Sequence, residues 1–315
     1  MSEELADVVL CICTRSRPEK LDRALQSLSR HEWPDGWQLL VVDNDCGRSA
    51  EEVTYRWRST IGLPVTYTVE PEVGFASVRN AALALCADAS AVCFFDDDAI
   101  AGPSWAARMH DVHERNPLAL VQSRVYRVPE IPQTRDGIAH LFRQLAIAPD
   151  PNYSGTNGLL VPITTLGGRR FNTRFNLTGG EDTDLIMRLN SAGAQTIQVH
   201  DAILIDEGRH SPNSVKDTTK VGFRSGRQYA EVLYVNGVNI NRPRARSLVG
   251  VPIAALLSLA SFTLGRREEA LGQLRKAAAR AGVLTVRSRN WPSGSNARSP
   301  DWTNDDGSDR EHGSH

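Results

Sequence analysis

The sequence predicts an α/β fold built on a mostly parallel, doubly wound sheet. Short apolar runs alternate with helical patterns from Val8 to Asp98, an order typical of strand–helix–strand units. The run Val92–Ile100 places four apolar residues directly before three acids, as expected of a buried central strand. Three predicted strands end in polar or acidic loops. Because the carboxyl ends of parallel strands share one edge of a sheet, these loops predict a ligand-binding crevice there.

The elements before the three acids follow from their residue patterns. The apolar run Val8–Cys13 predicts a buried strand, and Pro18 suits the first turn of the next helix, Glu19–Ser29. That helix places Leu21, Leu25 and Leu28 on one face. The remaining predicted elements in this part are the strands Leu39–Val42 and Val65–Val69 and the helices Glu51–Thr60 and Ser77–Cys86.

Beyond the acids the pattern is less regular. Pro103–Arg115 predicts a helix and Leu118–Val128 a strand, whereas the prolines and weak periodicity of Pro129–Pro151 predict a mobile or mixed segment. A second acidic motif, Glu181-Asp182-Thr183-Asp184, precedes the helical pattern Leu185–Ser191, which Gly193 closes. Val199–Glu207 is strand-like.

The three consecutive acids are the main chemical signal in the sequence. Adjacent carboxylates repel one another, and a divalent cation with oxygen ligands would offset their charge. Asp96 and Asp98 would point the same way if the strand continued. A plain acidic turn after a strand is the alternative. The loops Thr14–Arg17 and Asp43–Asp45 end two neighbouring predicted strands and are expected at the same crevice.

Composition limits the broad class of protein. The chain has 315 residues, 41% of them hydrophobic and 23% charged, which suits one large domain with an appendage. A net charge of −1 argues against a nucleic-acid partner. The five cysteines include no Cys-x-x-Cys pair, and the N-terminus is acidic without a signal-peptide pattern. We therefore expect a cytoplasmic location, at the inner face of the cell membrane if the C-terminal part contacts lipid.

The order of motifs resembles family 2 glycosyltransferases of the GT-A fold, and among these it is most similar to exopolysaccharide-type enzymes that act on lipid-linked acceptors. The resemblance spans about Val8–Ala230. Its motifs are Val-Leu-Cys-Ile-Cys-Thr-Arg-Ser-Arg-Pro, Leu-Leu-Val-Val-Asp-Asn, Glu-x-x-x-Gly-Phe-Ala-x-x-Arg-Asn, Phe-Phe-Asp-Asp-Asp, Gly155–Gly158 and Thr178–Leu185.

The resemblance implies a donor site for a nucleotide-diphosphate sugar, with a UDP-sugar as the expected donor and Mg²⁺ or Mn²⁺ as cofactor. Asp98 is expected to bind the metal, Asp96 to contact the ribose or the metal, and Asp97 to hold a metal-bound water. Asp43 would accept a hydrogen bond from the base, or instead cap the next helix. The other residues matched to nucleotide-sugar binding are Thr14, Arg17, Pro18, Arg79 and Asn80. The alternative for Arg79 is a surface arginine paired to Glu70 or Glu72.

The resemblance assigns the general base to Asp182, which would take a proton from the acceptor hydroxyl and so invert the anomeric centre. The alternative is an acid that only stabilises a helix N-terminus. His210 is a candidate metal ligand, with an exposed loop histidine as the alternative. The residues expected near the acceptor or the diphosphate are Gly155, Asn157, Glu181, Arg224 and Arg227. The late signature of processive synthases is missing, so we expect one sugar per cycle.

The C-terminal part contains the apolar run Leu248–Leu264, flanked by arginines on both sides. Three interpretations remain open: a buried helix over the catalytic domain, an in-plane membrane anchor, or a re-entrant hairpin broken near Pro252. We predict a catalytic domain over residues 1–235, a C-terminal helical segment over 236–287 with peripheral membrane contact, and a disordered tail over 288–315.

Three other functions are compatible with parts of the pattern. A haloacid-dehalogenase-like phosphotransferase also places Asp-x-Asp after an apolar strand, but it needs a lysine that does not occur between Asp98 and Glu181. A sugar nucleotidyltransferase usually carries a glycine-rich phosphate loop, and Thr14–Pro18 contains no glycine. The non-enzymatic alternative is a membrane-docking subunit with an inactive transferase fold.

Overall fold

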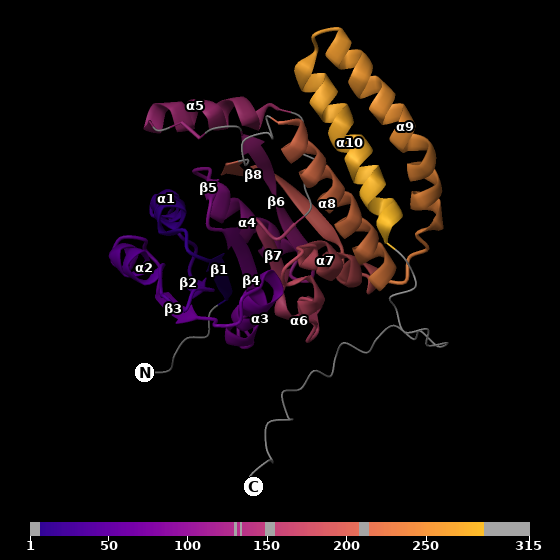
Figure 1. The fold of residues 1–315 in the computed structure, drawn as a ribbon. Coiled ribbons are helices and arrows are strands. Elements are labelled where there is room, and N and C mark those ends of the chain that lie inside the picture. Colours follow the sequence, from indigo (N-terminus) through magenta and orange to yellow (C-terminus); the bar gives the residue numbers. More distant parts are fainter. Residues whose placement is uncertain (1–6, 129–130, 133, 149–154, 208–213, 287–315) are drawn as a thin grey trace.

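The computed structural model describes residues 7–128, 131–132, 134–148, 155–207 and 214–286, and an eight-stranded sheet forms its centre (Figure 1). The strand order is β3-β2-β1-β4-β7-β6-β8-β5. The strands are β1 (Val8–Thr14), β2 (Trp37–Asp43), β3 (Val65–Val69), β4 (Ala91–Asp96), β5 (Ala99–Ala101), β6 (Leu120–Val128), β7 (Leu159–Pro162) and β8 (Thr196–Glu207). Only β5 and β7 run antiparallel to their neighbours in this sheet, which confirms the predicted mostly parallel arrangement.

Helices cover both faces of the sheet, as the doubly wound prediction requires. On one face the core joins the sheet to α1 (Pro18–Leu28), α2 (Glu51–Trp57) and α4 (Trp105–Arg115). On the other face it joins the sheet to α3 (Phe75–Leu85), α6 (Ile163–Leu166) and α7 (Glu181–Ser191). Both clusters are completed by apolar residues that alternate along β1, β2 and β4, because successive strand side chains point to opposite faces.

The register of the parallel strands places the expected site residues at one edge of the sheet. Thr14 at the end of β1 lies opposite Asp43 at the end of β2, and Cys13 lies opposite Asp96 at the end of β4. These three strands therefore end at nearly the same level, and the loops that follow them converge. The prediction of a common edge for the polar loops is confirmed.

Several predicted elements differ from the observed ones. The segment predicted as mobile or mixed contains a helix, α5 (Arg135–Ala146), whose N-cap Thr134 accepts a hydrogen bond from the backbone N–H of Gly137. The prolines that weakened the helical signal lie outside this helix. The short strands β5 and β7 pair through long-range backbone contacts that residue periodicity does not reveal. Helix α7, by contrast, agrees with the prediction, because it begins at Glu181 and the acidic motif forms its first turn.

The C-terminal part forms three long helices, α8 (Val215–Val235), α9 (Asn241–Thr263) and α10 (Arg267–Thr285), with α10 packed against both of the others (Figure 1). Helix α9 is continuous through Pro252, so the interpretation as a hairpin broken there is wrong. It is long and apolar enough to cross a membrane by length and composition. Its large apolar side chains are exposed, so the interpretation as a buried covering helix is also wrong. The predicted tail, 288–315, lies outside the described residues.

An aromatic cluster under α1 makes the stability of the core depend on pH. The ring of His31 lies 5.5 Å from that of Trp33 and 6.2 Å from that of Trp105, and burial lowers the pKa of His31 to about 4. The unfolded chain takes up a proton near pH 6.5, whereas the folded chain does so only near the lowered value. Stability is therefore lost as the pH falls from 6.5 towards 4.

We expect His31→Gln to weaken this acid sensitivity. Between pH 7 and pH 4.5, the loss in unfolding free energy should be about 2 kcal/mol smaller in the variant than in the wild type. Urea denaturation at the two pH values measures this difference. The control is His140→Gln on α5, where the side chain is exposed, and it should leave the pH dependence unchanged. Equal acid sensitivity in His31→Gln and the wild type would contradict the assignment.

Candidate active site

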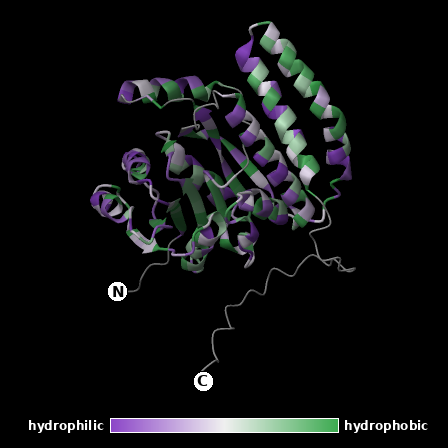
Figure 2. Cartoon of the chain, in the orientation of Figure 1, coloured by the Kyte–Doolittle hydropathy of each residue, from purple (hydrophilic) through white to green (hydrophobic). Residues whose placement is uncertain are grey.

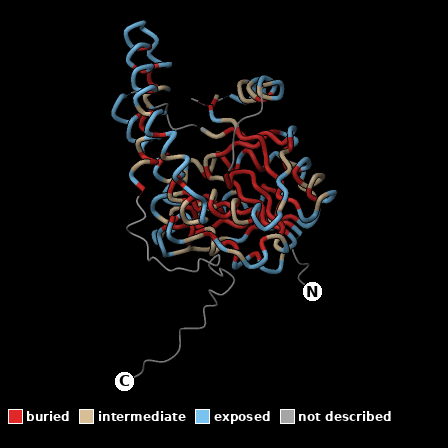
Figure 3. The backbone as a smooth tube through the Cα atoms, turned by 90° about the vertical axis from the view of Figure 1, so that its right-hand side faces the viewer, coloured by how far each residue is buried: buried red, intermediate tan, exposed pale blue. Residues whose placement is uncertain are grey.

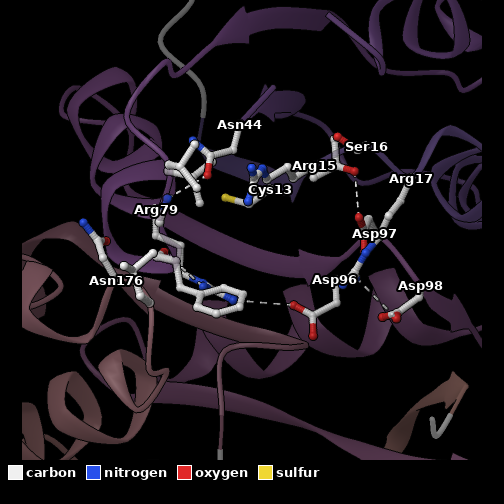
Figure 4. A pocket seen from close by; sticks show the side chains of 16 residues that line it. Cys13, Arg15, Ser16, Arg17, Asn44, Arg79, Asp96, Asp97, Asp98 and Asn176 are labelled. Carbon is white, nitrogen blue, oxygen red and sulfur yellow. Dashed lines mark hydrogen bonds and ion pairs between the residues drawn. The ribbon is translucent and has the colours of Figure 1, made fainter. Parts of the chain in front are cut away.

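A pocket of about 460 Å³ opens at the carboxyl edge of the sheet, between the ends of β1 and β4 and the start of α3 (Figure 4). Its polar lining comes from five parts of the chain that are distant in sequence. These residues are Thr14, Arg15, Ser16, Arg17, Asn44, Arg79, Asp96, Asp97, Asp98 and Asn176. Arginines and carboxylates thus face one cavity. Arginine suits a diphosphate, since its planar group can donate two parallel hydrogen bonds to phosphate oxygens.

The three acids after β4 have separate partners. Asp97 is buried and accepts a hydrogen bond from the Thr14 hydroxyl at 2.6 Å and one from Arg17 at 3.2 Å. It therefore holds the loop after β1 in place. Asp98 lies 3.0 Å from the Lys20 ammonium. Asp97 was predicted to hold a metal-bound water, but in the structure its carboxylate ties β4 to the β1–α1 loop.

Asp96 faces the opposite side of the pocket. Its carboxylate lies 3.9 Å from the guanidinium of Arg79 (Figure 4). Its backbone N–H donates to the Asn157 side chain at 3.2 Å. Burial raises the pKa of Asp96 to about 7, Arg79 opposes this rise, and the neighbouring Asp98 adds to it. A cation bound beside Asp96 would offset the repulsion that the neighbouring carboxylates exert on it.

Arg79 joins the acids of β4 to the acidic motif at the start of α7. One guanidinium nitrogen lies 2.9 Å from Glu181, while the other faces Asp96. Burial lowers the pKa of Arg79, but its acidic neighbours Glu181, Asp96 and Asp182 raise it by more. The alternative pairing of Arg79 with Glu70 or Glu72 is therefore wrong. The acids of the two motifs are therefore linked through one arginine, which itself lines the pocket.

The first turn of α7 is set by two glycines. Gly179 and Gly180 both have positive φ, at 77° and 105°, which side chains disfavour. They turn the chain so that Glu181 points inward, where burial raises its pKa while Arg79 opposes the rise. One carboxylate oxygen of Glu181 is buried without a hydrogen-bond partner among the described residues. Asp182 is half-buried, and its Oδ1 accepts from the backbone N–H of Thr183 at 2.6 Å.

We expect Arg79→Gln to destabilise the fold as well as the site, because it leaves the buried Glu181 without its cation. The unfolding free energy should fall by up to about 3 kcal/mol in urea titrations. Arg79→Gln combined with Glu181→Gln removes both charges and should recover most of this loss. A single variant as stable as the wild type, or a double variant no more stable than the single one, would contradict a structural ion pair.

Two residues predicted to touch the donor instead hold neighbouring loops and helices in place through hydrogen bonds. Asp43 is fully buried and accepts from the backbone N–H of Ala50 at 2.8 Å and from the Tyr67 hydroxyl at 2.9 Å. This is the helix-capping role left open as the alternative, and Asp43 does not line the pocket. Asn80 exchanges two hydrogen bonds with the backbone of Phe171, at 2.9 and 2.8 Å. Both are therefore corrected from ligand contacts to positioning residues in this structure.

Other predicted residues lie behind or away from the pocket. Pro18 is the first residue of α1, and Gly155 and Asn157 are buried. The Asn157 side chain accepts a hydrogen bond from the backbone N–H of Asp96. Because Gly155 and Asn157 are both buried, neither of them presents a free surface to a sugar in this structure. Arg224 and Arg227 line an open hollow on α8 with Lys216 and Lys220, and not the donor pocket. Their contact with the acceptor or the diphosphate stays a prediction. His210 lies outside the described residues.

Sequence reasoning missed two asparagines that hold the pocket wall. The Asn44 side chain donates to the carbonyls of Glu70 and Glu72 and accepts from the N–H of Gly74, which fixes the loop before α3. Asn176 accepts from the N–H groups of Ala76 and Ser77 at 2.9 and 2.8 Å. The polar end of β2 pointed to Asn44. Nothing in the local sequence pointed to Asn176, which acts across about 100 residues of chain.

Sequence reasoning also missed Asp206 and Lys20 near the expected metal ligand. Asp206 pairs in register with Ala99, next to Asp98, and its pKa is raised first by burial and then by the charge of Asp98. Lys20 follows Pro18 by two residues on α1, and its ammonium balances Asp98. The residue pattern of the strand that carries Asp206 gave no reason to expect this side chain at the site.

The carboxylates at this edge fit a divalent cation by the chemistry of their oxygen donors. Within the described residues, no three acid, histidine or cysteine side chains form a complete ligand group. Mg²⁺ is commonly held by one or two carboxylates together with substrate phosphates and water. Asp98 and Asp96 would therefore hold such an ion jointly with a diphosphate. The Lys20 ammonium beside Asp98 shows that a positive charge is accommodated there.

Solved structures share this fold. A mannosyltransferase from Pyrobaculum calidifontis, PcManGT, in complex with GDP-Man and Mn²⁺, aligns with a TM-score of 0.58 and 17% identity over 90% of this chain and 88% of that one. S. aureus TarS 1–349 in complex with UDP aligns with a TM-score of 0.51 and 14% identity over 86% of this chain and 90% of that one. At these identities the likeness concerns the fold, which is GT-A.

Sequence comparison extends the likeness to a curated relative and to a family. Succinoglycan biosynthesis protein ExoM from Rhizobium meliloti (strain 1021) is 26% identical over 243 residues, which are 74% of this chain and 77% of that protein. The model of the family described as Glycosyl transferase family 2 matches residues 9–172, the part of the chain that contains the β1 loop, Arg79 and the acids after β4. The chain belongs to glycosyl transferase family 2.

Proposed function

We propose that this glycosyltransferase moves one sugar per cycle from a nucleotide-diphosphate sugar, UDP-linked, to an acceptor hydroxyl with inversion at the anomeric carbon. The observation that supports this best is the position of Arg79, which lines the donor pocket with the acids of β4 and pairs with Glu181 in the first turn of α7. The acidic motif therefore lies next to the donor pocket, as a displacement between two bound molecules requires.

The reaction can be divided among the residues of this chain. Arg15, Arg17 and Arg79 bind and orient the diphosphate, while Asn44 and Asn176 keep the pocket wall in place. A bound Mg²⁺ or Mn²⁺ supplies charge that stabilises the leaving diphosphate. Asp182 removes the proton of the acceptor hydroxyl as that oxygen attacks the anomeric carbon from the side opposite the diphosphate. Attack from that side inverts the anomeric centre.

The acceptor we propose is a saccharide, either free or lipid-linked, in the biosynthesis of a cell-surface polysaccharide. The similarity to ExoM, whose name assigns it to succinoglycan biosynthesis, supports this class of acceptor. The reaction would then take place on the cytoplasmic side of the cell membrane. We propose no nucleic-acid substrate, because a net charge of −1 provides no general attraction to a polyanion.

A thermal-shift panel of UDP-glucose, UDP-galactose, UDP-N-acetylglucosamine and GDP-mannose, each with Mn²⁺ or with EDTA, tests the donor class. A donor present at 100 times its Kd should stabilise the fold by about 2.7 kcal/mol, or roughly 5 °C in Tm. We expect a UDP-sugar to give the largest shift, and only with Mn²⁺. Shifts with none of the four donors, or equal shifts in EDTA, would contradict the proposal.

A further inference from the structure

The outward face of α9 carries large apolar side chains, which is unusual for a helix exposed to water. The residues it buries against α10 are small: Ser247, Gly250, Ala254, Ser258 and Ser261. The residues it exposes are large and apolar, and the exposed fraction is 66% for Leu248, 67% for Leu256 and 62% for Leu259. A surface helix of a water-soluble domain shows the reverse order, with its apolar stripe turned inward. Figures 2 and 3 show this apolar, exposed helix at the edge of the molecule.

The small residues on the inner face of α9 are already packed against α10 and hydrogen-bonded to it. The Ser258 hydroxyl donates to the carbonyl of Ala270 at 2.8 Å, and Arg280 donates to the carbonyl of Gly250 at the same distance. The contact between α8 and α10 is closer still, because a Cβ at Gly226 would lie 1.7 Å from the carbonyl oxygen of Ala279. Close approach through glycine, alanine and serine is typical of helices that pack in lipid. The large apolar face therefore has no remaining role inside the described fold.

The neighbouring helix α10 decides how α9 can meet a membrane. Helices α9 and α10 lie side by side along their lengths and form a hairpin (Figures 1 and 3). Helix α10 exposes charged residues from its first turn to its middle, namely Arg267, Glu268, Glu269, Arg275 and Lys276. If α9 crossed the bilayer, α10 would carry these charges into the hydrocarbon, at a cost of several kcal/mol. The charges on α10 therefore exclude a spanning arrangement of this hairpin and favour one in the plane of the membrane.

Both ends of α9 carry positive charge. Arg242 and Arg246 are exposed at its start, and Arg266 is exposed just after its end. Exposed arginines near a bilayer surface are attracted to anionic lipid headgroups, by about 1 kcal/mol each. We propose that α9 is an in-plane membrane anchor. Its apolar face lies at the acyl boundary of an anionic leaflet, and α10 stays on the aqueous side. This inference stands independently of the proposed reaction.

Vesicle co-sedimentation of the full chain tests the anchor. The chain should sediment with vesicles that contain phosphatidylglycerol, and Leu248→Gln with Leu256→Gln should weaken this binding roughly tenfold or more. The matched control is Leu85→Gln with Leu118→Gln on the catalytic domain, where 57% and 65% of the side chains are exposed. It should bind like the wild type. Circular dichroism spectra and Tm values like those of the wild type in both double variants show that they fold.

Two further experiments test the role of the arginines and the depth at which α9 lies in the membrane. Arg242→Gln with Arg246→Gln should weaken binding to anionic vesicles roughly tenfold and leave binding to phosphatidylcholine vesicles unchanged. Nitroxide labels on cysteines placed at Val249, Leu256 and Thr263, which are exposed and lie on one face of the helix, should report one common shallow depth by electron paramagnetic resonance in a Cys46→Ser background. Cys46 is replaced because it is an exposed thiol.

Three outcomes would overturn the anchor. The first is a wild-type chain that stays in the supernatant with every vesicle composition. The second is a label at Leu256 that lies far deeper than the labels at both ends, which indicates a spanning helix. The third is a wild-type dimer, detected by light scattering without vesicles, that the leucine variant converts to a monomer while vesicle binding is absent. That result would assign the apolar face to a second copy of the chain.

Discussion

Replacing Asp98 by asparagine should abolish the metal-dependent part of donor turnover while leaving the fold intact. Asp98 lies at the pocket, beside Lys20, and 17% of its side chain is exposed. Metal-ion stabilisation of a leaving phosphoryl group contributes several kcal/mol, so we expect turnover to fall by roughly 10³-fold or more. The measurement is nucleoside diphosphate release from the preferred donor at saturating Mn²⁺.

The control for Asp98→Asn is Asp22→Asn, which removes the same charge from an acid on α1 that pairs with Arg56 at the surface. This control should turn over at nearly the wild-type rate. The Asp98 variant should also lose the difference in donor affinity between Mn²⁺ and EDTA. If Asp98→Asn retained both its turnover and its Mn²⁺ dependence, Asp98 could not be the metal ligand.

Asp182→Asn should separate binding from chemistry. Asp182 is close enough to Arg79 for its charge to raise the pKa of that residue, which lines the donor pocket. Asp182 does not line the pocket itself. Loss of a general base lowers the rate about 10²–10⁴-fold. We therefore expect kcat for sugar transfer to fall by that factor while the Kd of the donor changes little. Calorimetric donor titration and a transfer assay with a saccharide acceptor measure the two quantities.

The neighbouring acid provides the comparison for Asp182. Glu181→Gln removes a carboxylate one residue away, but this carboxylate is buried and paired with Arg79. We expect this variant to lose stability and donor affinity more than transfer rate. If Glu181→Gln lost the rate and Asp182→Asn kept it, the general base would be Glu181 and the role assigned to Asp182 would be wrong.

The parallel part of the fold could be predicted from the sequence because its signal is local. Strands buried on both sides, such as Val8–Thr14, read as continuous apolar runs, and each is followed by polar residues at its carboxyl end. The position of Asp98 at the site followed from the same logic. Antiparallel β7 and the short β5 depend on pairing between distant segments, and no periodicity within Leu159–Pro162 or Ala99–Ala101 could have revealed it.

The residues of the site were predicted less evenly. Charged side chains such as Asp96 at the end of β4 and Arg79 on α3 were found because a motif contains each of them. The difference between touching a ligand and supporting a loop could not be predicted, because it depends on which side chain reaches which backbone group. Asp43 and Asn44 are adjacent, yet Asp43 turns to the N-terminus of α2 while Asn44 turns to the pocket wall.

The role of α9 was an open question at the level of sequence. An apolar run of this length suits a buried helix, a spanning helix or an anchor equally well. What decides it is the pairing with α10, which places small residues such as Gly250 and Ser258 inside and leaves large ones outside. That arrangement depends on three-dimensional packing, so only the structure could supply it.

The products of a single turnover test the central claim most directly. We would incubate the purified chain with a UDP-sugar, Mn²⁺ and a saccharide acceptor and follow the phosphorus signals by ³¹P NMR. If Asp98, Arg79 and Asp182 border one glycosyl-transfer site, the only phosphorus product is UDP, formed in step with an inverted glycoside and absent in EDTA. Formation of UMP or UTP with a sugar phosphate, or release of inorganic phosphate, would instead show nucleotidyl or phosphoryl transfer and contradict the account.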